Sequence, residues 1–260
     1  MERTGKTALV TGASAGLGAG FARLFARDHH DLVLVARRRD KLDQLATELQ
    51  QMHGIHTTVI AADLTDPKAP QHLHEELLRA GIEVEFLVNN AGFDSNGAFA
   101  ELELARQLDM VELNVKALTH LTGLVLPAMI ARRSGRILNI GSGAGFLPGP
   151  FMATYYAPKA FVVSFTEALS YELRGTGVTA TVLCPGPTET EFAQVAGADK
   201  ASMFKTAADA ASIVRYGYRS MMAGKTVAVP GITMKLSLQS LRASPRSVMR
   251  VIAGRLNRPA

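Results

Sequence analysis

The chain of 260 residues is long enough for one large α/β domain or two small ones, and its 47% hydrophobic and 20% charged residues exclude wholesale disorder. Cys184 is the only cysteine, so no disulfide forms within the chain and a reducing, cytoplasmic setting is expected. The net charge of +5 arises in residues 231–260, which hold six basic residues and no acidic one. The remainder of the chain carries −1, so no general affinity for nucleic acid is expected.

Short runs rich in valine, isoleucine and leucine alternate with longer segments of helical period. The runs expected to form strands are Thr7–Val10, Leu32–Val35, Thr57–Ala61, Phe86–Val88, Arg136–Ile140, Val178–Leu183 and Thr226–Val229. The segments expected to form helices are Leu17–Asp28, Asp40–His53, Ala69–Ala80, Leu102–Ala131, Thr154–Arg174 and Ala207–Ala223. This alternation predicts a Rossmann-like, doubly wound parallel sheet of about seven strands with helices on both faces. We expect a single domain over residues 1–230, with neither a signal peptide nor an integral membrane segment.

The first expected strand runs directly into a glycine-rich turn, TGASAGLG (residues 11–18), and a helix follows. Glycines in such a turn let the backbone approach a pyrophosphate, whose charge lies at the helix N-terminus. Gly12, Gly16 and Gly18 have the spacing Gly-x3-Gly-x-Gly, which differs from the commoner Gly-x-Gly-x-x-Gly, and such a turn can also be purely structural. The flanking strand and helix favour a dinucleotide site.

The residue that distinguishes the two nicotinamide cofactors is expected at the end of the second strand. An acid there binds the ribose hydroxyls of NAD, whereas a nearby arginine accommodates the additional phosphate of NADP. Ala36 stands where the acid would be, and three arginines follow it. Because guanidinium binds phosphate in a bidentate manner, Arg37 and Arg38 favour NADP(H), the alternative being a solvated basic helix start.

Polar residues also follow the third and fourth strands. Asp63-Leu64 ends the third strand, where a carboxylate can hold the adenine amino group. The segment NNAG (residues 89–92) ends the fourth strand. The carboxyl ends of parallel strands meet at one sheet edge, so both segments are expected beside the cofactor groove.

Tyr155 and Lys159 are four residues apart in a helical segment, so phenol and ammonium share one helix face. A phenol has a reference pKa of about 10, and a neighbouring cation lowers that pKa towards the working range. Ser142 ends the fifth strand, where it can hydrogen-bond a substrate oxygen. Each of these residues alone is more often structural than catalytic.

Together these motifs give the chain a resemblance to a known family. Over residues 5–230 it resembles the classical short-chain dehydrogenase/reductases, nearest the ketoacyl and hydroxysteroid reductases. The matching features are TGxxxGxG (residues 11–18), NNAG (89–92), Asn114, Ser142, Tyr155-x3-Lys159 and PGPT (185–188). Many NADPH-using members carry a basic residue in the glycine-rich turn, which is absent here, so the expected preference depends on Arg37 and Arg38.

The resemblance implies a role for each matching residue. Tyr155 would exchange a proton with the carbonyl oxygen, Lys159 would tune Tyr155 and hold the nicotinamide ribose, and Ser142 would stabilise oxyanion charge. Asn114 would support a water that relays protons to Lys159, and Thr188 would hold the nicotinamide amide. The residues expected to contact the cofactor are Gly12, Ser14, Gly16, Leu17, Gly18, Arg37, Arg38, Asp63, Leu64, Asn90, Ala91, Gly92, Tyr155, Lys159, Pro185, Gly186 and Thr188. The scattered histidines have no metal-like spacing, so no metal site is expected.

Apolar residues beside the expected site can line a hydrophobic substrate pocket, or belong to ordinary core. They are Phe93, Phe146, Leu147, Phe151, Met152, Phe192, Met203 and Phe204. The basic C-terminal extension, residues 231–260, alternates apolar residues with arginines between Met234 and Arg258. This pattern is typical of an amphipathic helix that covers the pocket or lies on an anionic membrane surface, or of a tail packed on the body or a neighbouring subunit.

These features predict an NADPH-dependent oxidoreductase that transfers a hydride between nicotinamide and a hydrophobic ketone, aldehyde or alcohol. The family's usual use of two long helices suggests a homodimer or homotetramer. One alternative is a non-catalytic NADPH-binding regulator, which would not need Tyr155, Lys159, Ser142 and Asn114. Another is a ketoacyl- or lipid-type reductase acting at a membrane surface.

Overall fold

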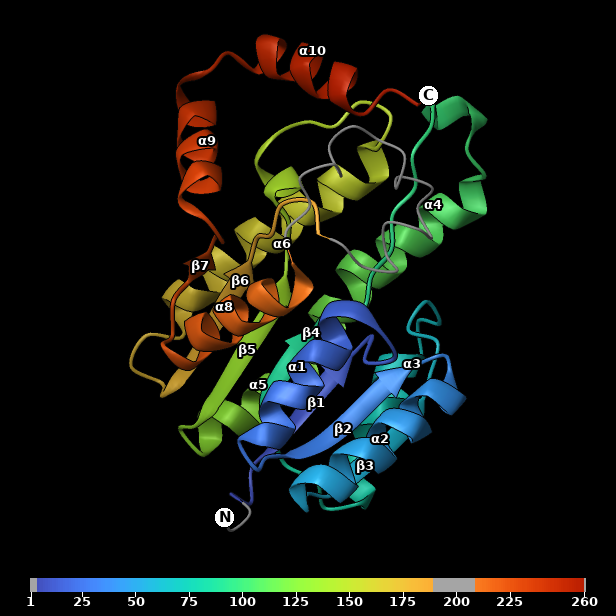
Figure 1. Ribbon diagram of the computed structural model, residues 1–260, viewed down its shortest axis with the longest axis vertical. Helices are drawn as coiled ribbons and strands as arrows, with labels where there is room; N and C mark the ends of the chain where they lie inside the picture. The colour runs from blue at the N-terminus through green and yellow to red at the C-terminus, as the bar shows by residue number, and fades with distance from the viewer. Residues whose placement is uncertain (1–3, 189–208, 260) are drawn as a thin grey trace.

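Seven parallel strands form one sheet in the computed structural model, which describes residues 4–188 and 209–259. The strands are β1 (Thr7–Thr11), β2 (Asp31–Ala36), β3 (Thr57–Ala61), β4 (Val84–Asn89), β5 (Gly135–Ile140), β6 (Val178–Leu183) and β7 (Val227–Ala228). Their order is β3-β2-β1-β4-β5-β6-β7, so the chain reverses its direction of strand addition between β1 and β4 (Figure 1). This confirms the Rossmann-like sheet and places its switch point, where such folds bind ligands, between the carboxyl ends of β1 and β4.

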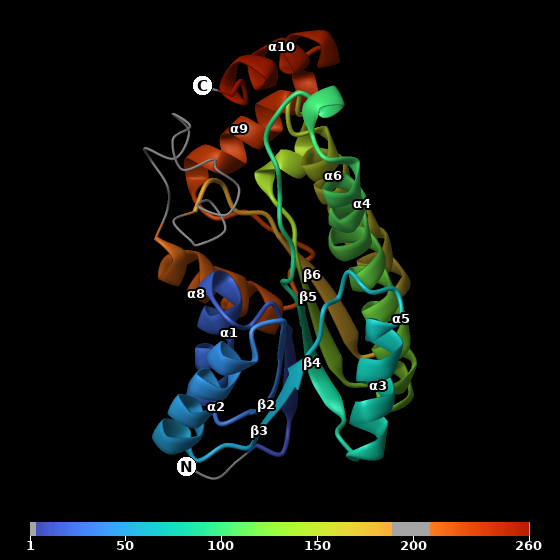
Figure 2. The same ribbon diagram turned by 90° about the vertical axis from the view of Figure 1, so that its right-hand side faces the viewer.

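Helices cover both faces of the sheet (Figure 2). One layer contains α1 (Gly16–Arg27), α2 (Arg39–His53) and α8 (Ala210–Met222), and the other contains α3 (Ala69–Arg79), α5 (Leu118–Ala131) and α6 (Ala153–Glu172). In the first layer the fully buried ring of Phe25 lies 5.1 Å from Phe86 of β4 and 4.9 Å from Tyr218 of α8, measured between ring centroids. In the second, Leu121 and Met129 of α5 pack against the opposite face. These two apolar clusters fix the position of the sheet, and with it the carboxyl edge that carries the polar motifs.

The expected helix Leu102–Ala131 contains a wider turn. It is built from α4 (Leu104–Val111), the π-helix η2 (Glu112–Ala117) and α5, in direct succession. Single π turns often occur at functional sites, and this one contains the buried Asn114. Contrary to expectation, Leu104–Ala131 meets the length and hydropathy criteria of a membrane span, the one such helix in the described chain. Its segments nevertheless contact α3, α6, β4 and β5, as those of a core helix do.

The C-terminal extension forms two helices above the carboxyl edge of the sheet, α9 (Ile232–Ala243) and α10 (Arg246–Leu256) (Figures 1 and 2). The sequence pattern allowed one continuous amphipathic helix over residues 234–258, but two helices form instead. Pro245 separates the two helices because proline has no N–H donor and disfavours helical backbone in the residue before it. Met249, Ala253 and Asn257, spaced by four, are buried. The extension therefore presents one face of α10 to the body of the protein.

Candidate active site

The glycine-rich turn lies where β1 ends and α1 begins. Gly12 and Gly16 have φ of +65° and +54°, a region that favours glycine. A Cβ atom at Gly18 would lie 2.2 Å from the Gly12 carbonyl oxygen, so only glycine allows this close approach. Among the described residues no side chain caps α1, whose N-cap is Ala15, so its first N–H groups are available to an anion. The turn therefore fits a diphosphate and supports a dinucleotide cofactor.

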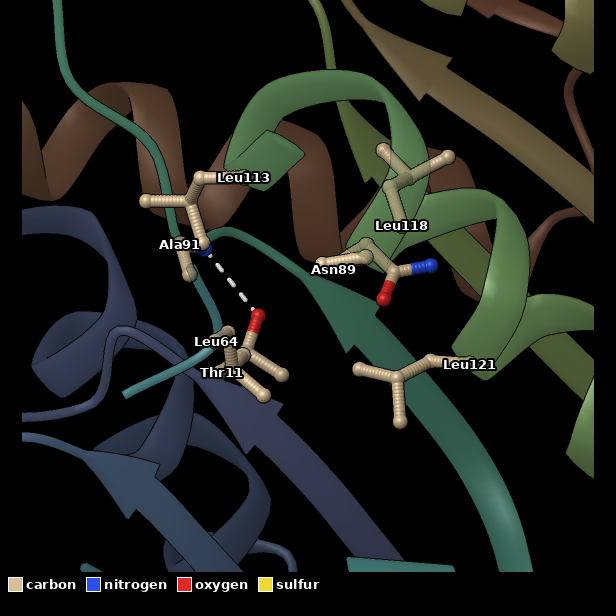
Figure 3. Close-up of a pocket in the computed structure, with 8 residues that line it drawn as sticks. Thr11, Leu64, Asn89, Ala91, Leu113, Leu118 and Leu121 are labelled. Atoms are coloured by element: carbon tan, nitrogen blue, oxygen red, sulfur yellow. Dashed lines mark hydrogen bonds between the residues drawn. The ribbon is translucent and has the colours of Figure 1, made fainter. Parts of the chain in front are cut away.

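Hydrogen bonds join the glycine-rich turn to the NNAG segment across the switch point. Thr11 Oγ1 donates to the Val88 carbonyl at 3.3 Å and accepts from the N–H groups of Asn90 and Ala91, both at 3.0 Å. Figure 3 shows the bond between Thr11 and Ala91. Asn90 Nδ2 donates to the carbonyls of Thr11 at 2.9 Å and Gly12 at 3.2 Å. The ends of β1 and β4 are thus fixed relative to each other.

A small pocket lies beside this edge, between the strand ends and the helix that contains η2 and α5 (Figure 3). Its lining is mainly apolar and comprises Thr11, Leu64, Asn89, Ala91, Leu113, Ala117, Leu118 and Leu121. The predicted cofactor residues Leu64 and Ala91 therefore share one wall. Next to Leu64, Asp63 Oδ1 accepts hydrogen bonds from the N–H of Thr65 at 3.0 Å and its hydroxyl at 2.8 Å, which fixes the carboxylate at the end of β3.

Arg38 reaches across from the end of β2 to the glycine-rich turn. Its Nη2 and Nε atoms donate to Ser14 Oγ at 3.2 and 3.4 Å. Arg37 is exposed beside Ala36, whereas Arg39 lies 3.5 Å from Asp43 one turn along α2. A guanidinium therefore lies against the phosphate-binding turn, and Ala36 provides no carboxylate that would repel a second phosphate.

Ser142, Tyr155 and Lys159 meet between the carboxyl end of β5 and the start of α6. The side chains of Tyr155 and Ser142 share a hydrogen bond, and Ser142 Oγ also accepts from the Ala144 N–H at 3.1 Å. Lys159 is buried, with Nζ 5.7 Å from the centroid of the Tyr155 ring, and it donates to the Ile140 carbonyl at 2.7 Å. A phenol, a hydroxyl and an ammonium group thus occupy one site, as acid catalysis at a carbonyl oxygen requires.

The pKa of Tyr155 is raised, contrary to the lowering expected from a neighbouring ammonium group. Burial raises this pKa and the negative charge of Asp94 raises it further, whereas the hydrogen bond with Ser142 lowers it. The effect of burial is the largest of the three. Burial also lowers the pKa of Lys159, to about 8. The phenol therefore stays protonated at neutral pH, which is the form that donates a proton.

Asn114 fixes the segment that follows β4. Its Oδ1 accepts from the Phe93 N–H at 3.2 Å, and its Nδ2 donates to the Phe93 carbonyl at 2.9 Å. A Cβ atom at Gly92 would lie 2.6 Å from Asn114 Oδ1, so glycine is required there. The water-mediated link from Asn114 to Lys159 stays a prediction.

Residues 185–188 follow β6 at the same edge of the sheet. The Pro185 carbonyl accepts from the Gly143 N–H at 2.9 Å, and Thr188 Oγ1 donates to the Gly186 carbonyl at 3.0 Å. The PGPT segment is therefore joined to the residue after Ser142. Three expected pocket residues, Phe192, Met203 and Phe204, lie outside the described residues.

Two residues near Tyr155 were missed by the sequence analysis. Asp94 is buried two residues after the NNAG segment, where an acid so close to a cofactor motif was a signal that could have been used. Asn257 Oδ1 accepts from the hydroxyl of Tyr156 at 3.1 Å, and its Nδ2 donates to the Pro150 carbonyl at 3.2 Å. No local pattern indicates this long-range contact. This bond directs the hydroxyl of Tyr156 to Asn257, which agrees with the expectation that Tyr156 lies elsewhere on the helix than Tyr155.

A dinucleotide-binding turn with a serine, a tyrosine and a lysine at the same sheet edge defines a dehydrogenase of the Rossmann class. The protein-family model for short chain dehydrogenase matches residues 6–201. The chain therefore belongs to the short-chain dehydrogenase/reductase family, nearest its ketoacyl reductase branch, and is an oxidoreductase acting on carbonyl or alcohol groups.

Named relatives and solved structures agree with this family. Sulfoacetaldehyde reductase 2 of Chromohalobacter salexigens is 43% identical over 197 residues, which cover 75% of this chain and 77% of that protein. The human very-long-chain 3-oxoacyl-CoA reductase is 35% identical over 74% of this chain but only 62% of its own length, so the chain spans less than two thirds of that relative. The short-chain dehydrogenase from Sphingobium yanoikuyae in complex with NADPH superposes with a TM-score of 0.84 at 33% identity, covering 94% of this chain and 95% of that one.

Proposed function

We propose that the chain is an NADPH-dependent reductase of ketones and aldehydes with apolar substituents, which also oxidises the corresponding alcohols. The observation that carries this proposal is the hydrogen-bonded pair of Ser142 and protonated Tyr155 beside an uncapped, glycine-lined helix start. The reductase names of the relatives and the NADPH bound by the Sphingobium structure support it.

In this reaction Tyr155 donates its phenolic proton to the carbonyl oxygen, and Ser142 donates a hydrogen bond to the same oxygen. Bound NADPH supplies the hydride. The N–H groups at the start of α1 would hold its diphosphate, and Arg38 with Arg37 would hold the ribose phosphate. Lys159 would hold the ribose next to the nicotinamide, and its ammonium group returns a proton to Tyr155. In the reverse direction Tyr155 takes the alcohol proton.

The proposed preference for NADPH depends on Ala36 and the two arginines after it. A hydrogen bond to a charged ligand contributes about 1.5–3 kcal/mol, or roughly ten- to a hundredfold in affinity. Replacing Ala36 with Asp and Arg37 with Ser should therefore flatten or reverse the preference, chiefly through the KM for the cofactor. The measurement is kcat/KM with NADPH and NADH for the wild type and the double variant.

Arg39→Ser is the matched control because that guanidinium pairs with Asp43 instead. It should keep the preference. Equal wild-type kcat/KM values for the two cofactors, or a preference for NADH, would show that Arg37 and Arg38 are only a solvated helix start.

The proposed apolar substrate rests on half-buried aromatic residues in the loops around Tyr155, among them Phe93 and Phe151. Phe146, by contrast, packs against a core cluster. A panel of alkyl and aryl ketones and aldehydes, followed by NADPH absorbance, tests the proposal. Turnover of the apolar members supports it. Tight NADPH binding without turnover of any carbonyl or alcohol would instead favour a non-catalytic regulator.

A further inference from the structure

Asp94 is a buried acid beside the candidate site that the proposed mechanism does not use. It lies two residues beyond Gly92 and is only 5% exposed. Its charge adds to the effect of burial in raising the pKa of Tyr155, and it opposes the effect of burial on the pKa of Lys159. The carboxylate is therefore within electrostatic reach of both the proton donor and the ammonium group.

The backbone that carries Asp94 is fixed on both sides. Both polar atoms of the Asn114 amide bind the backbone of Phe93, at 3.2 and 2.9 Å. Arg106 donates to the Asp94 carbonyl at 3.3 Å, and its guanidinium lies 5.1 Å from the centroid of the Phe93 ring. The next two residues are bound by Gln107 of α4 and by the carbonyl of Asn257. These bonds fix the backbone that carries Asp94 beside the site.

One of the two oxygens of the Asp94 carboxylate has no hydrogen-bond partner among the described residues. This oxygen, Oδ1, is buried. The two cations that act on it, Lys159 and Arg106, donate to the backbone carbonyls of Ile140 and of Asp94 itself. Burial raises the pKa of Asp94 to about 6, whereas both cations and a hydrogen bond from its own backbone lower it. The side chain is therefore mostly in its charged form at neutral pH. A buried charge with one oxygen left without a partner is costly, and in a protein site it commonly marks a group that meets a ligand.

We propose that Asp94 is a substrate-recognising carboxylate, which binds an N–H or O–H donor on the carbon next to the reacting carbonyl and repels an anion there. The proposal rests on the proposed reductase function, since Tyr155 and Ser142 fix the position of the carbonyl oxygen. It narrows the substrate class to apolar ketones and aldehydes that carry a hydroxyl or ammonium group at this position. Sulfoacetaldehyde, named for the relative from Chromohalobacter salexigens, carries a sulfonate there and would be disfavoured.

Four phenyl ketones of similar size test this selectivity at pH 7. Propiophenone has no donor next to the carbonyl, α-hydroxyacetophenone has a hydroxyl, α-aminoacetophenone has an ammonium group, and benzoylacetate has a carboxylate. For the wild type, kcat/KM should be at least about tenfold higher with the two donor-bearing ketones than with propiophenone, and lowest with benzoylacetate.

Asp94→Asn keeps the shape and one acceptor oxygen but removes the charge. Relative to propiophenone, it should abolish most of the advantage of α-aminoacetophenone, about ten- to a hundredfold in kcat/KM, and raise kcat/KM with benzoylacetate. A smaller loss with α-hydroxyacetophenone would identify the ammonium group as the preferred donor, and an equal loss would show that Asp94 binds the two donors equally. Asp109→Asn, which removes an exposed acid of α4, is the control for net charge and should leave the selectivity unchanged.

A wild type without selectivity for donors, or an Asp94→Asn variant with the wild-type ratios, would overturn the proposal. If none of the ketones is reduced, the reductase function fails, and binding then decides the role of Asp94. Calorimetric titration of α-aminoacetophenone and propiophenone into NADP⁺-loaded wild type and Asp94→Asn should show tighter binding of the ammonium ketone only in the wild type. Equal binding by both proteins would overturn the role of Asp94. Asp94→Ser, a smaller polar replacement, serves the same comparison if the asparagine variant does not fold.

Discussion

Tyr155 combines a hydrogen bond to Ser142 with surroundings that keep its phenol protonated. A proton donor of this kind suits the reduction of a carbonyl. Tyr155→Phe keeps the ring and its packing but removes the proton, so the rate of ketone reduction should fall by about two to four orders of magnitude. NADPH binding, measured by fluorescence titration, should change little. A variant that retains more than a tenth of the wild-type rate would exclude Tyr155 as the acid.

Tyr156→Phe is the matched control at the adjacent position. It removes the hydroxyl that binds Asn257 and leaves Tyr155 intact. Its rate should stay within a few-fold of the wild type, whereas its melting temperature should fall.

Lys159 should determine how the rate depends on pH. Burial lowers the pKa of Lys159 to about 8, so the ammonium group is lost as pH rises through that value. The wild-type kcat/KM for reduction should therefore decline above about pH 8. Lys159→Met should be slower, should lack this decline and should have its optimum at higher pH. An unchanged profile with activity retained would remove Lys159 from the mechanism.

At the scale of elements, α10 fixes the loops around the site. Asn257 joins Tyr156 of α6, Pro150 of the preceding loop and Asn96 of the loop after β4. Asn257→Ala leaves the Tyr156 hydroxyl and the Pro150 carbonyl without their partners, whereas Asn96 keeps its bond to the backbone carbonyl of residue 257. The variant should therefore lower the free energy of unfolding by about 1–3 kcal/mol, measured by denaturant titration. It should also lower kcat with the ketones. Arg258→Ala, at an exposed neighbouring position, should change neither value, and equal stabilities of the two variants would contradict the role of Asn257.

Strands were predictable from local composition, whereas elements defined by distant contacts were not. Val178–Leu183 has its predicted bounds because a short run buried at nearly every position is typical of a parallel sheet. The edge strand Thr57–Ala61 also has its predicted bounds, although most of its residues are only half-buried. The π-helix Glu112–Ala117 was missed because helical periodicity does not distinguish one wide turn from a regular helix. The break at Pro245 was visible in the sequence, but the contacts of Asn257 depend on how the tail folds back.

The same distinction applies to the site. Ser142, Tyr155 and Lys159 were found because their spacing is local and characteristic, and the structure brings them together. The pKa of Tyr155 was predicted in the wrong direction because it depends on burial and on the charge of Asp94, which spacing does not report.

At the scale of the whole molecule, exposed apolar side chains on neighbouring helices favour the proposed homodimer or homotetramer. Leu104, Leu108 and Val111 of α4 are exposed, as is Phe161 of α6, and the two helices contact each other. The side chain of Leu108 is 60% exposed, so Leu108→Glu places a charge in the middle of this apolar surface. The variant should sediment as smaller species than the wild type, shifted towards the monomer. Leu78→Glu on α3, at 65% exposure, should leave the assembly intact. A wild type that sediments as a monomer would contradict the assembly.

The central claim, that the chain reduces carbonyl groups with NADPH through Tyr155, is tested most directly by following the transferred hydrogen. NADPH labelled with deuterium at the transferable position of nicotinamide C4 is incubated with an accepted aryl ketone, and the alcohol is analysed by mass spectrometry. We expect one deuterium on the former carbonyl carbon of the alcohol that the wild type forms, and about two to four orders of magnitude less of this labelled alcohol in the same time with Tyr155→Phe. An alcohol formed without the label, or equal amounts of labelled alcohol from the two proteins, would contradict this claim.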